Sequence, residues 1–433
     1  AVRDGLAHFH VARHHGSRVL RVHHGADGEH EGERLEAAWV SHPDLLPDEA
    51  RTDPQTFARR EVAKRCLYGV DKNHMATDLA KLSLWLVTLS KDEDFSFLNH
   101  ALKTGDSLVG LSFDQLAEFN WQTDGTYSGF TQQFRKKVDA ARADRQRIRS
   151  APDNVTFEQQ EQRLEEADRD IAEVQLGGDA VIATFFSETK AKARKEALNE
   201  FQVQLGREDG WDKARQLRAQ LASGDHPITP FHWQIEFPEV VEGETPGFDS
   251  IVGNPPFAGK NTITHGNRTG FLDWLKVISP ESHGNADLSA HFFRRAYGLL
   301  RAGGTMGLIA TNTIGQGDTR ESGLRYLLQE QKGKIYRAKR RVKWPGEAAV
   351  VVSTVHVGKG GAGDAPIQLD GRPVSRISAF VREGDFDDTP AVLEENEAKS
   401  FVGSYILGMG FTFDDENAAK GKATSLSEMN RLI

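Results

Sequence analysis

The residues best suited to chemistry lie in the tetrapeptide Asn254-Pro255-Pro256-Phe257, which directly follows the apolar run 250–253. That run predicts a buried strand leading into a loop. Two consecutive prolines fix φ at about −65° and remove two backbone donors, which leaves a rigid loop that offers carbonyl acceptors. The Asn254 oxygen beside such carbonyls can hold both hydrogens of an amino group, and the Phe257 ring can stack on a flat ring. Taken alone, the tetrapeptide also fits a plain turn.

Two acids change this interpretation. Asp71 ends the apolar run 66–70, which predicts a short buried strand, and apolar residues recur at helical spacing after it: Met75, Leu79, Leu82, Leu86 and Leu89. Asp106 lies in a second stretch, 103–108, that reads as a loop at a strand end. Ligands of open α/β sheets bind beyond the carboxyl ends of the strands. A site for a nucleoside cofactor needs two acids followed along the chain by an Asn-Pro-Pro-Phe loop, and this sequence has them in that order. One carboxylate would accept hydrogen bonds from the ribose hydroxyls and the other from the adenine amino group.

The elements that must position these residues form two α/β blocks around a polar segment. Strand, acid and helix in the first block suggest a βα unit of a parallel sheet. Strands are expected again at 306–310, 334–342 and 348–357, and the short turn between the last two favours antiparallel pairing. Between the blocks, residues 113–229 predict an antiparallel helical hairpin or short coiled coil, with apolar faces made by Phe130, Phe134 and Val138, and by Leu164, Ala167, Ile171 and Val174. We interpret this segment as a solvated structural insertion rather than a dedicated binding surface.

Composition excludes several classes of protein. The chain has 433 residues, of which 38% are apolar, and it has no apolar run of the roughly 20 residues that span a bilayer. The single cysteine, Cys66, excludes a disulfide scaffold and a cysteine-built zinc site, fits a cytoplasmic location, and reads as a buried strand residue. Half of the 16 histidines precede residue 43, but they lack a metal-binding spacing, so no metal is predicted.

Long segments of the chain resemble the adenine-specific DNA methyltransferases that use S-adenosylmethionine. The resemblance is closest to the large type IIG restriction–modification and phage-defence enzymes. The segments that carry it occur in the family's order: 65–86 (RCLYGVDKNHMATDLAKLSLWL), 95–110, 230–240 (PFHWQIEFPEV), 248–257 (FDSIVGNPPF), 307–324, 344–353 and 408–413. It implies an α/β fold with a Rossmann-like class I methyltransferase sheet, mostly parallel with one antiparallel strand and interrupted by the helical insertion.

The resemblance also implies roles for single residues. Asp71 would hold the cofactor ribose, and Asp106 would read its adenine in a pocket lined by Ser107 and Leu108. Asn254 and the Pro255 carbonyl would accept from the target N6 amino group, in the rigid loop that Pro256 completes. Phe257 would stack on the flipped-out adenine, since a base inside a duplex is out of reach. Trp344 would form a second aromatic wall. The roles imply direct methyl transfer, so Cys66 is not expected to be catalytic.

The start of the chain departs from the family pattern. The glycine-rich cofactor loop would fall in residues 1–9, where Gly5 fits but Leu6, Ala7 and His8 do not. We therefore expect residues 1–112 to be the cofactor half with a degraded or truncated start. Residues 113–229 are the insertion, 230–360 the half with the Asn-Pro-Pro-Phe loop, and 361–433 lead toward a target-recognition domain outside this chain. Two alternatives stay open: a catalytically silent DNA-binding or scaffold component of a defence complex, and a methyltransferase for an RNA base or a protein glutamine.

Charge is distributed unevenly along the sequence. The whole chain carries a formal charge of −9, which argues mildly against a nucleic-acid partner. Residues 248–360, however, carry a net charge of +8, so the acidity belongs to the N-terminal part and to the tail. Residues 334–343 hold six Lys and Arg and no acid, and we expect Arg340 and Arg341 to contact DNA phosphates, although a protected edge strand explains the run equally well. The expected partners are double-stranded DNA and other restriction or defence subunits, with no membrane.

Overall fold

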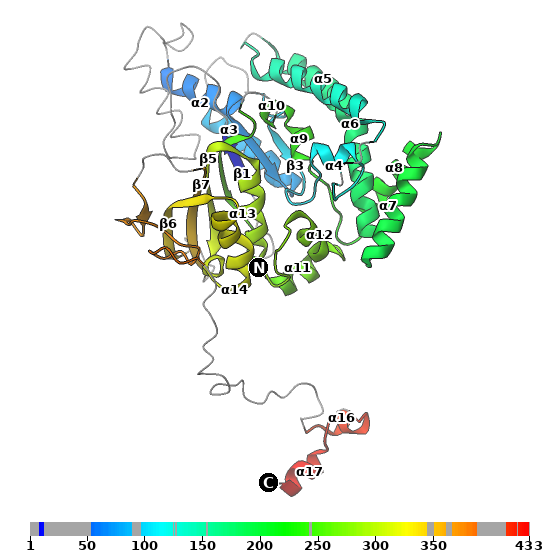
Figure 1. The fold of residues 1–433 in the computed structure, drawn as a ribbon, viewed down its shortest axis with the longest axis vertical. Coiled ribbons are helices and arrows are strands. Elements are labelled where there is room, and N and C mark those ends of the chain that lie inside the picture. The colour runs from blue at the N-terminus through cyan, green and yellow to red at the C-terminus, as the bar shows by residue number, and fades with distance from the viewer. Residues whose placement is uncertain are drawn as a thin grey trace. The chain divides into compact units, whose positions relative to one another are not determined.

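The computed structural model describes residues 8–12, 53–88, 97–123, 125, 128–152, 155–241, 245–343, 350–360, 366–387, 413–421 and 423–432. The chain divides into two compact units, Ala1–Asp387 and Asp388–Ile433. In the second unit, the described elements are two short helices, α16 (Asp415–Ala419) and α17 (Leu426–Leu432). Everything below concerns the first unit (Figure 1). No helix in the described ranges is both long enough and apolar enough to cross a membrane.

A nine-stranded mixed sheet forms the centre of the first unit, in the order β3-β2-β1-β4-β5-β7-β6-β8-β9. Its strands are β1 (His8–Ala12), β2 (Leu67–Asp71), β3 (Leu102–Thr104), β4 (Phe248–Asn254), β5 (Leu300–Thr311), β6 (Gly333–Lys343), β7 (Val351–Lys359), β8 (Gln368–Leu369) and β9 (Arg372–Pro373). Parallel pairs are β2 with β3, β4 with β5, and β6 with β8. The predicted α/β class is confirmed at this level.

The expectation of a single antiparallel strand is wrong. β7 is antiparallel to both β5 and β6, as predicted for the late pair of strands. β1 is also antiparallel to both of its neighbours, β2 and β4, and β9 is antiparallel to β8. Backbone groups of a five-residue strand are satisfied in either direction, so its direction depends on the chain connections and not on its own sequence.

The strand directions bring four carboxyl ends to one edge of the sheet. Because β1 runs antiparallel to both β2 and β4, these two strands are parallel to each other. β3 follows β2 and β5 follows β4 in parallel, so β2, β3, β4 and β5 all end at the same edge. We call this the carboxyl edge. It is the edge at which open α/β sheets bind ligands.

Helix α3 (His74–Val87) confirms the helix expected after Asp71 and begins where the Asn73 side chain accepts a hydrogen bond from the Met75 backbone N–H at 3.0 Å. Its packing face differs from the predicted apolar stripe. Ala80, Leu84 and Trp85 pack against a small core cluster, together with residues of α2 (Pro54–Arg65) and β3. The stripe itself faces outward, with Met75 70% exposed and Leu86 66% exposed, while Leu89 lies outside the described residues.

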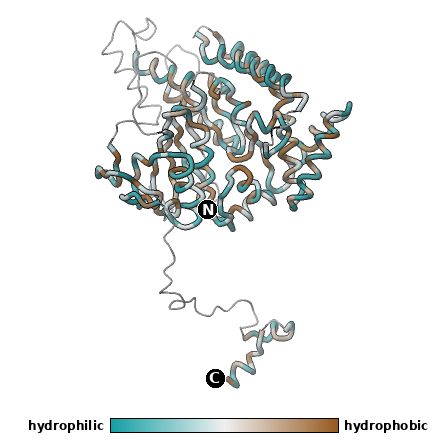
Figure 2. Tube along the Cα trace, viewed as in Figure 1, coloured by the Kyte–Doolittle hydropathy of each residue, from teal (hydrophilic) through white to brown (hydrophobic). Residues whose placement is uncertain are grey.

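The segment 113–229 is helical, as predicted. It contains α4 (Phe113–Ala117), α5 (Thr131–Arg149), α6 (Phe157–Ser187), α7 (Ala191–Leu205) and α8 (Gly210–Leu221). The predicted apolar faces of α5 and α6 are buried, with Phe134 and Ile171 both 0% exposed. Figure 2 shows apolar positions recurring along these otherwise hydrophilic helices. The insertion packs in the same compact unit as the sheet, and the finer domain boundaries at 112, 229 and 360 stay a prediction.

The remaining described helices connect the sheet strands. They are α9 (Trp233–Glu236), α10 (Pro238–Val241), α11 (Lys260–Gly266), α12 (Phe271–Ile278), α13 (Leu288–Leu299), the 3₁₀ turn η3 (Asn312–Gly315), α14 (Gly317–Arg320), the π-helical turn η4 (Glu321–Arg325) and α15 (Tyr326–Gln329). β5 begins directly after α13, because Leu300 already pairs with Phe248 of β4.

A buried ion pair joins the insertion to α10, the helix that precedes β4. The Arg145 guanidinium of α5 donates to both Glu239 carboxylate oxygens, at 2.8 and 3.0 Å, and both side chains are 0% exposed. Tyr68 of β2 donates its hydroxyl to the same carboxylate at 3.2 Å. Burial would raise the pKa of Glu239, but the Arg145 charge holds that pKa below its usual value. Burial lowers the pKa of the adjacent His100 to about 3, so this imidazole stays neutral.

Removing one partner of this pair should be strongly destabilising. Arg145→Met leaves a buried carboxylate without its counter-ion, and we expect the free energy of unfolding to fall by about 3–5 kcal/mol. The double variant Arg145→Met/Glu239→Leu should recover much of that loss. Urea unfolding measures both. The control is Arg147→Ala, which removes the exposed pair with Asp144 and should cost at most about 1 kcal/mol. Equal losses for Arg145→Met and Arg147→Ala would contradict the assignment.

Candidate active site at the carboxyl edge

Asp71 and Asp106 lie close together because their strands are paired. β2 and β3 are parallel with Asp71 opposite Thr104, and the Gly105 backbone N–H donates to the Asp71 carbonyl at 2.9 Å. Both acids are largely buried, at 4% and 6% exposure. The Asp71 carboxylate accepts from the Asn73 backbone N–H at 2.7 Å, which ties it to the start of α3. The predicted pairing of two acids at one edge is therefore present in the fold.

The Asp106 carboxylate stabilises residues 105–112, which we call the Asp106 loop, and it forms an ion pair with a lysine. Its Oδ1 accepts from the Leu108 backbone N–H at 3.0 Å, and the Asp106 backbone N–H donates to the Thr229 carbonyl at 2.8 Å. Its Oδ2 forms an ion pair with Lys72 Nζ at 3.3 Å. The Lys72 side chain is half-exposed, and sequence reasoning did not single it out. Lys72 directly follows Asp71 in the sequence, and this position next to a candidate site residue could have identified it.

The segment 229–234 fixes this loop from the other side. The Phe231 backbone N–H donates to the Val109 carbonyl at 2.7 Å, and the Trp233 indole N–H donates to the Ser107 carbonyl at 3.1 Å. The His232 Nδ1 accepts from the Leu111 backbone N–H at 3.0 Å, so its Nε2 carries the proton and donates to Asp179 of α6 at 3.2 Å. Residues 230–240 are one of the segments that carry the family resemblance. In the structure, this segment holds the Asp106 loop in place.

The tight contact explains two glycines of the loop. A Cβ on Gly110 would lie 2.0 Å from the Phe231 carbonyl oxygen, and a Cβ on Gly105 would lie 2.8 Å from the Phe231 ring. Both distances are too short for any larger residue unless the backbone moves. Ser107 and Leu108, predicted to line the adenine pocket, lie between these glycines and are 5% and 1% exposed.

The Asn-Pro-Pro-Phe loop follows β4, one of the four strands that end at the carboxyl edge. Asn254 is the last residue of β4, and its side-chain oxygen is buried with no hydrogen-bond partner among the described residues. Pro255 is buried, while Pro256 and Phe257 are partly exposed. The next residue, Ala258, accepts from the Leu288 backbone N–H at 2.8 Å, which fixes the loop to the start of α13. A buried, unpaired carbonyl oxygen is costly unless a ligand donates to it.

The other predicted residues are placed differently. Gly5 and Trp344 lie outside the described residues, as do most of the N-terminal histidines. Arg340 of β6 donates through Nε and Nη2 to Oδ2 of Asp370, at 3.0 and 2.8 Å, so its charge is already neutralised within the fold. Arg341 is exposed at a break in the β6–β7 register and has φ +53°, a left-handed conformation that re-aims its side chain. Among the described residues, no cluster of three or more metal-binding side chains occurs.

A family model described as Eco57I restriction-modification methylase matches residues 65–336, which span β2 to β6. The chain belongs to this family. The match includes both acids and the Asn-Pro-Pro-Phe loop, so the resemblance to restriction–modification methyltransferases is confirmed. Over 291 residues, the Eco57I-family chain is 22% identical to a putative type II restriction enzyme and methyltransferase of Methanocaldococcus jannaschii. That alignment covers 60% of this chain but 23% of the relative, so this chain spans about a quarter of the relative's length.

Solved structures give weaker likenesses. The type IIL restriction-modification enzyme MmeI, solved in complex with DNA, is 22% identical, covering 41% of this chain and 26% of its own, with a TM-score of 0.29. A putative class I S-adenosylmethionine-dependent methyltransferase from Listeria monocytogenes is 9% identical over 55% of this chain and 91% of its own, with a TM-score of 0.23. Scores this low carry no argument, so the fold description rests on the strand pairing above.

The contact between the Asp106 loop and Phe231 yields a stability test. We expect Gly110→Ala to lower the melting temperature by several degrees, because the added methyl group collides with a backbone oxygen and breaks the hydrogen bond between Phe231 and Val109. Gly129→Ala is the matched control, because a Cβ there meets no atom within 4 Å. Differential scanning calorimetry of both variants measures the effect. A Gly110→Ala protein as stable as Gly129→Ala would show that the loop is not held in this way.

Proposed function

We propose that this chain transfers a methyl group from S-adenosylmethionine to the N6 amino group of an adenine in DNA. The observation that carries the proposal is the buried, unpaired Asn254 side-chain oxygen at the carboxyl edge. It is the acceptor that an exocyclic amino group would fill. Membership of a family described as restriction-modification methylases supports methyl transfer to DNA. The strand order β3-β2-β1-β4-β5-β7-β6 supports a class I methyltransferase sheet.

The target amine would be held by the chain's own acceptors. The lone pair of an adenine N6 is delocalised into the ring, which makes this nitrogen a weak nucleophile. Asn254 Oδ1 and the Pro255 carbonyl can accept one N–H each, and this favours a pyramidal nitrogen whose lone pair points away from both acceptors. Rigid placement of the acceptors then supplies catalysis by positioning and electrostatics, without a covalent nucleophile. The partly exposed Phe257 is available to stack on the base.

The acids at the edge fit the cofactor. Asp71 and Asp106 are adjacent, buried and anchored by backbone N–H groups, as carboxylates for a ribose and an adenine amino group need to be. S-adenosylmethionine supplies an activated methyl group when bound. Asp106 would read the adenine only after Lys72 releases Oδ2 or shares it. The described residues supply no glycine-rich loop for the methionine part, since Gly5 lies outside them.

One assay tests the proposal against its alternatives. The chain is incubated with methyl-labelled S-adenosylmethionine and, in parallel reactions, with unmethylated genomic DNA, RNA or a release-factor protein. The nucleosides and the protein are then analysed by mass spectrometry. We expect N6-methyladenine, and we expect Asn254→Ala to lower its rate roughly a hundredfold or more while leaving binding of S-adenosylhomocysteine unchanged. Asn199→Ala, at an exposed position of α7, is the matched control.

The outcomes separate the three candidate functions. Label in RNA or in a release-factor protein, but not in DNA, would move the activity to the second alternative. DNA binding without any transfer would identify a silent component of a defence complex. Full DNA methylation by Asn254→Ala would remove the proposed role of this residue.

The basic strand β6 gives a separate test of DNA binding. We expect Arg341→Ala to weaken binding and to reduce the slope of log K against log salt by about one, because one phosphate contact is lost. Arg340→Ala should change the slope less, because Asp370 already neutralises that guanidinium. Fluorescence anisotropy at several salt concentrations measures both variants. An Arg341→Ala slope equal to that of the unmodified chain would place the DNA elsewhere.

A further inference from the structure

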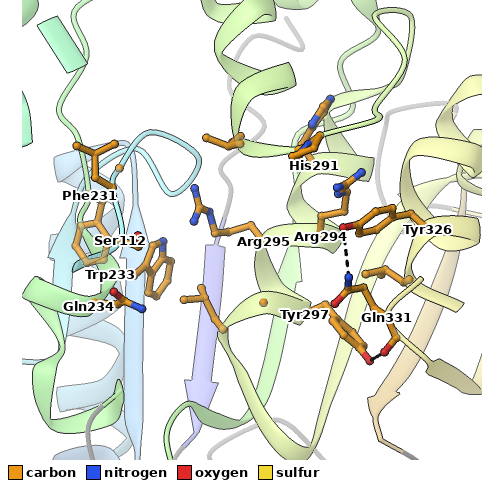
Figure 3. Close-up of a pocket in the computed structure, with 18 residues that line it drawn as sticks. Ser112, Phe231, Trp233, Gln234, His291, Arg294, Arg295, Tyr297, Tyr326 and Gln331 are labelled. Atoms are coloured by element: carbon orange, nitrogen blue, oxygen red, sulfur yellow. Dashed lines mark hydrogen bonds between the residues drawn. The ribbon is translucent and has the colours of Figure 1, made fainter. Parts of the chain in front are cut away.

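A cavity of about 330 Å³ lies next to residues 110–112, which follow Asp106 along the chain (Figure 3). Its walls come from Gly110–Ser112, from the segment 231–234, from α13 and from the region around α15. The volume is at the lower end of the roughly 300–1,000 Å³ found for small-molecule sites. None of the residues assigned above to the target amine or to the cofactor lines it. It is therefore a separate space that the proposed function leaves unused.

Three basic side chains of α13 line this cavity. His291, Arg294 and Arg295 are spaced so that they share one side of the helix. Arg295 Nε and His291 Nδ1 are buried and have no hydrogen-bond partner among the described residues. Figure 3 shows Arg295 extending from α13 toward the wall formed by Ser112 and Trp233, with Arg294 and Tyr326 on the opposite side. Burial lowers the pKa of Arg295 to about 10, so its guanidinium remains charged at neutral pH.

Burial lowers the pKa of His291 to about 4, so the cations of the cavity are the two arginines, and carboxylates balance them poorly. Burial lowers the pKa values of both arginines, and the charges of Asp106 on Arg295 and of Glu281 on Arg294 offset this lowering only in part. Neither arginine forms an ion pair with a carboxylate of the described residues. The Arg294 guanidinium instead stacks 3.4 Å from the centre of the Tyr326 ring. Both arginines are partly buried, and a cation removed from water without a counter-ion is costly, so an anion in the cavity would stabilise both of them.

We propose that this cavity binds a small oxyanion, a carboxylate or phosphate attached to a planar ring. Guanidinium groups match such oxyanions with two parallel hydrogen bonds. We infer that the ligand carries a planar ring because the aromatic side chains of Phe231 and Trp233 line the opposite wall of the cavity. The Trp233 indole N–H is already used by the Ser107 carbonyl, so this residue offers its ring and not its donor. The site is independent of the methyl-transfer proposal.

The test is calorimetric titration of the full chain at constant ionic strength with three probes: inorganic phosphate, phenyl phosphate and benzoate. Comparing the affinities of phenyl phosphate and benzoate shows which of the two oxyanions the cavity prefers. Comparing the affinities of phenyl phosphate and inorganic phosphate shows whether the ring contributes to binding. We expect at least one ring-bearing probe to bind, and Arg295→Gln to weaken it roughly ten- to a hundredfold. Arg372→Gln, at an exposed position of β9, should change nothing.

A second variant does not depend on removing a buried charge. Gly298 of α13 lines the cavity, and a Cβ added there meets no atom within 4 Å. Gly298→Leu should fill the space and abolish binding, while Gly298→Ala should leave it unchanged. Both substitutions raise helix propensity, so neither threatens the folding of α13.

Three results would overturn the proposal. They are the absence of binding by both ring-bearing probes, unchanged binding by Gly298→Leu, and full competition by S-adenosylhomocysteine. The last would place the anion at the carboxyl edge instead. Since no methyl transfer is measured, a failure of the proposed function would leave this result intact, and the reverse also holds.

Discussion

The architecture depends on the segment 229–241, which is hydrogen-bonded in two directions at once. Toward the sheet, its backbone and the Trp233 and His232 side chains hold the Asp106 loop. Toward the insertion, Glu239 accepts from Arg145 of α5, and Glu236 accepts from Gln175 of α6 and pairs with Lys103 of the sheet. The insertion is thereby an internal support for the carboxyl edge, because each of these carboxylates would be a costly buried charge without its partners.

This support leaves the site largely organised before any ligand arrives. The Asp106 loop lies so close to Phe231 that a Cβ at Gly105 or Gly110 would collide with it, and the Asn254 loop is stiffened by two prolines and anchored to α13. Lys72 is the exception. Its ion pair with Asp106 joins a half-exposed side chain to a buried carboxylate, so it is the contact most easily exchanged for a ligand. The proposed catalysis by positioning would rest on these fixed acceptors.

Local signals predicted the parts of the fold that local physics decides. β2, Asp71 and α3 follow from an apolar run, an acid and apolar residues at helical spacing, and the strand and the helix lie where the sequence placed them. The packing face of α3 was not predictable, because periodicity reveals a stripe but not which side meets the sheet. The direction of β1 was equally hidden, since five residues pair well either way. The Arg145–Glu239 contact spans 94 residues, and such distant pairings leave no mark in either neighbourhood.

Long-range pairing changes the free charge of the basic segment from what its sequence suggests. Residues 248–360 carry a net charge of +8, and six of the cations lie in the run 334–343. One of them, Arg340, is neutralised by Asp370, which lies beyond that segment and so escapes the count. Arg341, the next residue, is turned outward by the register break and remains exposed. Neighbouring arginines in one basic run therefore have different roles. Arg340 fixes the β8–β9 turn against β6, whereas the charge of Arg341 is available to a binding partner.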